Sequence, residues 1–176
     1  MNSVNGTAVR SEHRTTLAAG RAPGLSRSEL TALLRRTTAD SDVWLPRLQL
    51  PDGDRRWWTQ LSADERVDVW LLSWLPGQNT ELHDHGSSAA AFSVVRGLLA
   101  EVRIDAGHRR VTVPRPAGST VWLAPGVIHD MCGAGIGPAV SIHAYSPPLT
   151  RMTYYATDCT GLHTARTVQT NEPEQE

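Results

Sequence analysis

The chain has 176 residues, a length that fits one domain with a sizeable hydrophobic core. Its formal net charge is −1, with both signs spread along the whole length, which argues against a nucleic-acid or membrane-surface partner. The two cysteines form no CxxC pair, and no apolar run is long enough for a signal peptide or a membrane span. We therefore expect a globular cytoplasmic protein without a disulfide framework.

A helix near the N-terminus is the first predicted element. Residues 1–24 are rich in Ser, Thr, Gly, Ala and Arg without periodicity and are expected to be a flexible segment. Ser26 and Glu29 then form a capping-box signature. The leucines that follow share one face of a helix that ends near Asp40. Residues 42–58 contain prolines and an Asp-Gly turn, so we expect irregular structure with short strand pieces there.

Short strands separated by Gly and Pro fill the chain from residue 67 onward. The segments predicted as strands are 67–75, 89–96, 98–104, 109–113, 119–123, 127–131, 139–146 and 152–156. This pattern, without alternating helices, is typical of an all-β sandwich or barrel. We predict an all-β domain over residues 25–164, with a short N-terminal helical segment, and a flexible C-terminal tail over residues 165–176.

An H-x-H pattern supplies the first candidate metal ligands. Because side chains alternate along an extended segment, His83 and His85 project to one side and Asp84 to the other. Two imidazoles on one side suit a chelating strand. Loops and solvent-exposed faces often carry the same pattern, so the surrounding residues decide between the two interpretations.

The surroundings resemble the two sequence motifs of the cupin superfamily. The first motif has a Gly separated from H-x-H by five residues, then a Glu and a second Gly; the second motif runs from a Gly to P-x-G and a third His. Gly77, His83, His85 and Gly97 match the first motif, and Gly118, Gly126 and His129 match the second. The resemblance covers roughly residues 67–146. It implies a single cupin (jelly-roll) β-barrel that holds a metal ion on three histidines.

Two positions depart from the cupin pattern. Ala90 stands where the first motif usually has a metal-binding Glu, and the proline of the second motif is displaced by one residue to Pro125. The loss of the carboxylate leaves three neutral imidazoles. Such a set can bind Fe(II), Zn(II), Ni(II) or Cu(II), so the ligands alone do not name the metal.

A later strand carries polar side chains on one face. If residues 139–146 are extended, Ser141, His143 and Tyr145 share a face and apolar residues occupy the other. The polar face could lie in water, as in many antiparallel sheets. We favour a hydrogen-bonded ladder suited to proton handling, because solvent-facing strands usually carry charged residues instead.

The His-Asp-His-Gly sequence, the three-His set without the Glu and the Ser-Ile-His-Ala-Tyr-Ser-Pro-Pro sequence together resemble the thiol dioxygenase family of cupins. This family includes cysteine dioxygenase and 3-mercaptopropionate dioxygenase. The resemblance implies that His83, His85 and His129 bind Fe(II) and that Ser141, His143 and Tyr145 form a catalytic relay beside it. It also implies that both oxygen atoms of O2 are transferred to the sulfur of a small thiol, giving a sulfinate. Animal-type enzymes link a cysteine at the position of Ala90 to the relay tyrosine, so this chain resembles the bacterial branch.

An arginine is expected to bind the substrate carboxylate, because its planar guanidinium can grip two oxygens at once. Cysteine-type members of the family place an Arg before the first long strand. An ungapped count from the first ligand reaches Trp57, so the neighbouring Arg56 or Arg55 would serve after a small shift. Arg151, beyond the Pro-Pro turn, is a third candidate.

The resemblance therefore implies an Fe(II)-dependent thiol dioxygenase with O2 as co-substrate, acting on L-cysteine to give cysteine sulfinate. A 3-mercaptopropionate dioxygenase is a close alternative. A metal-binding or ligand-sensing cupin without turnover, and another three-His cupin dioxygenase that cleaves a carbon–carbon bond, also remain open. We expect a monomer whose partner is the small thiol, with no nucleic-acid, membrane or protein partner.

Overall fold

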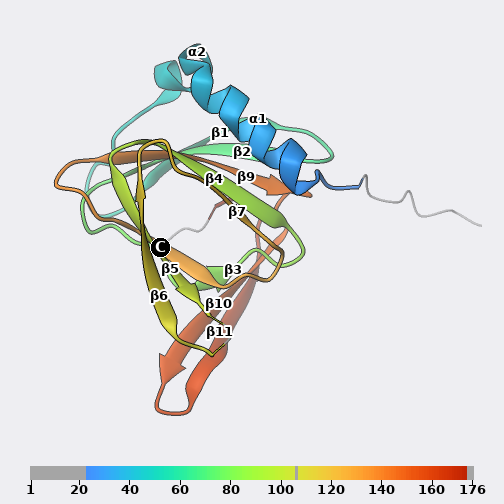
Figure 1. Ribbon diagram of the computed structural model, residues 1–176, viewed down its shortest axis with the longest axis vertical. Helices are drawn as coiled ribbons and strands as arrows, with labels where there is room; N and C mark the ends of the chain where they lie inside the picture. Colours follow the sequence, from blue (N-terminus) through green and yellow to red (C-terminus); the bar gives the residue numbers. More distant parts are fainter. Residues whose placement is uncertain (1–22, 106, 174–176) are drawn as a thin grey trace, which may run out of the picture.

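Figure 1 shows the computed structural model of the chain, which describes residues 23–105 and 107–173. One antiparallel sheet has five strands in the order β1-β2-β9-β4-β7, and the other has six in the order β11-β10-β3-β8-β5-β6. The strands are β1 (Trp57–Ala63), β2 (Asp68–Trp74), β3 (His83–Asp84), β4 (Ala89–Arg96), β5 (Leu98–Ile104), β6 (Arg110–Pro116), β7 (Thr120–Leu123), β8 (His129–Gly133), β9 (Ala139–Ser146), β10 (Arg151–Asp158) and β11 (Gly161–Gln169). The predicted all-β cupin architecture is confirmed.

The predicted N-terminal helix is α1 (Arg27–Ala39), which lies across the five-stranded sheet (Figure 1). The capping box is present: Ser26 Oγ accepts the Glu29 amide at 3.3 Å, and a Glu29 carboxylate oxygen accepts the Ser26 amide at 2.7 Å. Leu30 and Leu34 are fully buried against the sheet. Within the described residues, no helix is long and apolar enough to cross a membrane.

Every predicted strand is present, but the connections differ from expectation at two places. The segment 42–58, expected to be irregular, contains the short helix α2 (Ser41–Trp44) and a 3-10 turn η1 (Leu45–Arg47), and β1 begins at Trp57. The prediction of a flexible tail from residue 165 is wrong for residues 165–169, which belong to β11. This strand is mostly exposed and pairs with β10, so backbone pairing rather than an apolar face defines it. Residues 1–22 of the predicted flexible N-terminal segment lie outside the described residues.

Strand β9 lies in the middle of the five-stranded sheet, paired with both β2 and β4, and it is buried along its whole length. Its apolar side chains, Val140, Ile142 and Ala144, belong to the core beneath α1. Its other face points into the barrel, where Tyr145 belongs to a separate hydrophobic cluster between the two sheets. The polar residues of β9 therefore do not face water, and the interior of the barrel is the place where their chemistry can act.

Candidate metal centre

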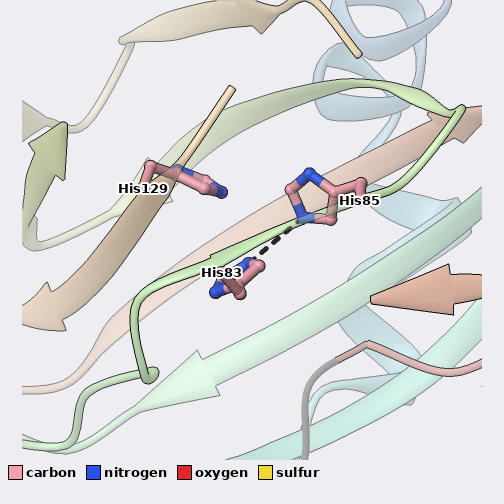
Figure 2. Close-up of side chains that lie close together, drawn as sticks. All are labelled: His83, His85 and His129. Atoms are coloured by element: carbon pink, nitrogen blue, oxygen red, sulfur yellow. Dashed lines mark hydrogen bonds between the residues drawn. The ribbon is translucent and has the colours of Figure 1, made fainter. Parts of the chain in front are cut away.

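Two strands of the six-stranded sheet bring the three histidines together. His83 begins the two-residue strand β3, and its direct partner across the ladder to β8 is His129. His85 lies two residues further along the chain, on the same side of the extended segment. The Nε2 atoms of His83 and His85 lie 3.2 Å apart. Figure 2 shows the three rings pointing toward one another. Their ligand atoms all lie within 4.8 Å of one another, and all three residues are buried. The predicted triad is therefore assembled.

The histidine nitrogens fit a metal ion. Nitrogen ligands lie about 2.0–2.1 Å from a divalent cation, so two of them at right angles are about 3 Å apart. This agrees with the 3.2 Å between His83 and His85. Nε2 of His129 is buried and has no hydrogen-bond partner among the described residues. An unsatisfied buried nitrogen is costly, and coordination would satisfy it.

The partners of the other ring nitrogens leave Nε2 as the coordinating atom. Nδ1 of His83 lies 2.7 Å from the carbonyl oxygen of Glu81, which can only accept, so Nδ1 carries the hydrogen. Nδ1 of His129 faces a carboxylate oxygen of Glu101 at 3.3 Å. Burial lowers the pKa of His129 to about 4 and that of His85 well below its ordinary value. Both imidazoles are therefore neutral at neutral pH, the state that binds metals.

Asp84 projects away from the other two residues of the H-x-H pattern, as the alternation predicts. Its Oδ2 accepts the Tyr155 hydroxyl at 2.6 Å, and its Oδ1 accepts the Gly86 amide at 2.7 Å. Burial, followed by the Asp84 hydrogen bond and charge, raises the pKa of Tyr155 to about 12, so this phenol stays a donor. Asp84 thus ties the histidine segment to β10 from the outside.

The polar face of β9 lies beside the histidines. Ser141 Oγ is 2.9 Å from His143 Nε2, and it also accepts the indole N–H of Trp74 at 2.9 Å. Because Trp74 can only donate, the serine hydroxyl hydrogen is available to His143. Burial lowers the pKa of His143 to about 3, so this ring is neutral. The ring of Tyr145 is buried, with its centroid 4.9 Å from that of His85.

One cavity connects these groups. Its lining residues are Arg56, Leu72, Trp74, Thr80, His83, His85, His129, Met131, His143, Tyr145 and Pro173. Arg56 is 5% exposed, and its guanidinium carbon lies 4.6 Å from the centre of the Trp74 ring. The other two arginine candidates, Arg55 and Arg151, are exposed and do not line the cavity. The structure thus brings one of the three candidates to the histidines.

Sequence reasoning missed the lining residues Leu72, Thr80 and Met131, and it also missed Pro173 and Glu101. Pro173, assigned to a flexible tail, is buried against the cavity. Glu101 is fully buried on β5, and it contacts His129, Arg103 and Arg115. Burial acts to raise the pKa of Glu101, but hydrogen bonds from His129 and the two arginines lower it to about 2. The sequence signal that could have identified Glu101 is its position in the predicted strand 98–104, where the alternation of side chains points it toward the interior.

The fold and the site together define a cupin barrel with a buried three-histidine cluster that suits a metal ion. The family model of cysteine dioxygenase type I matches residues 25–121, and the chain belongs to this family. Cysteine dioxygenase type 1 of Danio rerio is 29% identical over 108 residues, covering 54% of this chain and 54% of that protein. The match thus spans about half the length of the curated relative. The family match ends before His129 and the polar face of β9, which the structure adds to the site.

Solved structures resemble the barrel at low sequence identity. A Klebsiella pneumoniae protein with a double-stranded β-helix domain superposes with a TM-score of 0.52 at 16% identity, covering 69% of this chain and 94% of that chain. Oxalate oxidase in complex with the substrate analogue glycolate gives a TM-score of 0.52 at 17% identity, with 60% of this chain and 59% of that chain covered. At these identities the likeness shows the cupin fold alone.

Proposed function

We propose that the protein is an Fe(II)-dependent thiol dioxygenase that converts L-cysteine to cysteine sulfinate. The observation that carries the proposal is the convergence of three buried imidazoles in a cavity that also holds one buried guanidinium, Arg56. Membership of the cysteine dioxygenase type I family supports the same reaction class. The exposed free thiol of Cys159 favours a reducing compartment such as the cytoplasm.

The neutral ligand set suits an anionic sulfur. An Fe(II) ion on the three imidazoles would supply a binding site for a thiolate and the redox capacity to react with O2. Since no carboxylate lines the cavity among the described residues, the full positive charge of the ion is available to the substrate. A thiol that coordinates a cation is deprotonated. The overall reaction forms two sulfur–oxygen bonds and breaks the oxygen–oxygen bond, so that RS⁻ and O2 give RSO2⁻.

Arg56 binds the substrate carboxylate in this proposal. Its guanidinium remains charged at all relevant pH values and can hold both carboxylate oxygens. Stacking on Trp74 restricts its position, so the group is held before the substrate arrives. A thiol bound at the histidines and a carboxylate bound at Arg56 would fix the substrate at both ends, which supplies the orientation that catalysis needs.

The β9 residues handle protons and orient the substrate. Tyr145 lines the cavity beside His85 and donates its phenol hydrogen to the polar group of the substrate. His143 lines the same cavity, and Ser141 positions it through the 2.9 Å hydrogen bond. Trp74 holds Ser141 in turn, so the relay rests on a rigid aromatic side chain. Tyr145 and His143 are the catalytic residues, and Ser141 is a positioning residue.

A 3-mercaptopropionate dioxygenase is the second candidate. This substrate carries the same thiol and carboxylate as cysteine but lacks the amino group. Arg56 would bind its carboxylate in the same way, and the lining residues described offer no carboxylate partner for an ammonium group. A metal-binding cupin without turnover is the alternative outside catalysis.

The test is oxygen consumption by the iron-loaded protein with cysteine and with 3-mercaptopropionate separately. We expect sulfinate to form in step with oxygen uptake, and both product oxygens to carry label when ¹⁸O2 is supplied. His129→Ala is the matched control, because it removes one ligand and should abolish uptake. Iron bound at one ion per chain without uptake from either thiol would contradict the proposal and favour a non-catalytic cupin.

A further inference from the structure

A buried carboxylate lies behind one of the three metal ligands. Glu101 has no exposed surface, and its Oε1 lies 3.3 Å from Nδ1 of His129. The metal-binding Glu of the cupin pattern is absent here, since Ala90 occupies its position. The carboxylate of Glu101 instead approaches the His129 ring from the side opposite Nε2.

Strand register places the carboxylate there. In the ladder between β5 and β8, Arg103 is the direct partner of His129, and Glu101 is the partner of Met131. Residues two apart on a strand share a face, so Glu101 lies diagonally across from His129, within reach of a long side chain. The neighbouring ladder to β6 pairs Leu99 with Arg115, which puts Arg115 diagonal to Glu101 from the other side.

Two arginines hold the carboxylate in place. Oε1 accepts Nε of Arg103 at 2.9 Å, and Oε2 accepts Nε and Nη2 of Arg115 at 2.9 Å and 2.6 Å. The arginine side chains are 33% and 19% exposed, whereas that of Glu101 is fully buried. The carboxylate and its two guanidinium partners together carry a net positive charge. Glu101 can therefore direct the imidazole without neutralising the positive charge of the metal centre.

We propose that Glu101 is the positioning residue of the metal centre, which fixes the hydrogen of His129 on Nδ1 and turns Nε2 toward the cation. The inference rests on the metal role of the triad proposed above. A metal-binding histidine commonly donates its other ring N–H to a carboxylate, which sets the tautomer and the ring orientation. His83 has the carbonyl of Glu81 for this purpose, and Glu101 performs it for His129 with an ionic acceptor.

The simpler interpretation is that Glu101 only joins β5 to β6 through Arg115. The two interpretations differ in what a variant changes. A purely structural residue would alter the melting temperature of the metal-free protein, whereas a positioning residue also alters metal affinity and ligand geometry. Cobalt(II) is a suitable probe, because its visible absorption reports the geometry of its ligands and it does not react with oxygen in the way that Fe(II) does.

The experiment is a Co(II) titration of the parent, Glu101→Gln and Asp105→Asn, with the melting temperature of each metal-free protein. Asp105→Asn is the matched control, since it removes a carboxylate that pairs with Arg109 on the surface at the end of the same strand. We expect Glu101→Gln to weaken Co(II) binding by about 10- to 100-fold and to change the absorption spectrum. Asp105→Asn should leave both unchanged.

If Glu101→Gln does not fold, the double variant Glu101→Gln with Arg115→Gln replaces it, because it also removes the more buried of the two guanidiniums that pair with Glu101. The same loss of affinity is expected. Parent-like affinity and spectrum in whichever variant folds, even with a lower melting temperature, would overturn the positioning role. Failure of the parent itself to bind Co(II) would instead overturn the proposed metal centre, and with it this inference.

Discussion

Replacing Arg56 with Met should weaken turnover of thiol carboxylates selectively. Met keeps an apolar stem against Trp74 and removes the charge and the N–H donors of the guanidinium. A hydrogen bond to a charged group contributes about 1.5–3 kcal/mol. At about 1.4 kcal/mol for each factor of ten, kcat/KM for cysteine should fall by roughly 10- to 100-fold. The loss should fall mainly on KM, because the carboxylate is bound equally in the ground state and the transition state.

The assay compares oxygen uptake with cysteine and with cysteamine, which has the same thiol and amine but no carboxylate. For Arg56→Met, we expect kcat/KM to fall for cysteine and to stay near the parent value for cysteamine. Arg55→Met is the matched control, since its side chain is exposed and lies outside the cavity lining. An equal loss for both substrates would show that Arg56 supports the cavity itself and would refute carboxylate binding.

Two further variants test the role of Tyr145 in turnover and the effect of the buried Asp68 of β2 on stability. Tyr145→Phe should keep the parent's metal content but slow turnover by about 10²–10⁴-fold, as expected for a lost proton-handling group; parent-like turnover would exclude Tyr145 from the relay. Burial raises the pKa of Asp68 from 3.8 to about 6, so the folded chain binds this proton more tightly than the unfolded chain. The resulting stability is present below pH 4 and is lost as the pH rises through 6, a difference of about 3 kcal/mol. Asp68→Asn should remove that part of the pH dependence in urea unfolding at pH 4 and pH 8, and an unchanged difference would contradict the assignment.

Much of the barrel was predictable because its strands end at glycines and prolines. Strand β5 and strand β9 form with the predicted bounds, since each is flanked by such residues. Gly97 illustrates the signal: its φ of +76° is unfavourable for other residues, and an added Cβ would lie 2.7 Å from the Pro138 carbonyl oxygen. Strand β1 was not predicted, because it begins within the segment expected to be irregular. Strands β3 and β11 were not predicted either, because one is two residues long and the other has no buried face. Their conformation depends on partners that are distant in sequence.

The candidate site was predictable where spacing alone determines side-chain direction. Alternation along an extended segment was enough to place His83 and His85 on one side and the polar residues of β9 on another common face. The choice of Arg56 over Arg55 was not accessible, because neighbouring residues on an irregular segment differ only in which one the fold buries. Glu101 was missed for a related reason. Its contact with His129 depends on the register between β5 and β8, which no local pattern encodes.

An anaerobic Fe(II) titration of the parent and of single histidine variants tests the three-histidine centre most directly. We expect one ion per chain in the parent, and loss of that binding in His83→Ala, His85→Ala and His129→Ala alike. His108→Ala and His163→Ala serve as controls, because both residues are exposed and outside the cavity, and they should bind as the parent does. Parent-like Fe(II) binding by any of the three triad variants would show that the imidazoles do not hold a common ion.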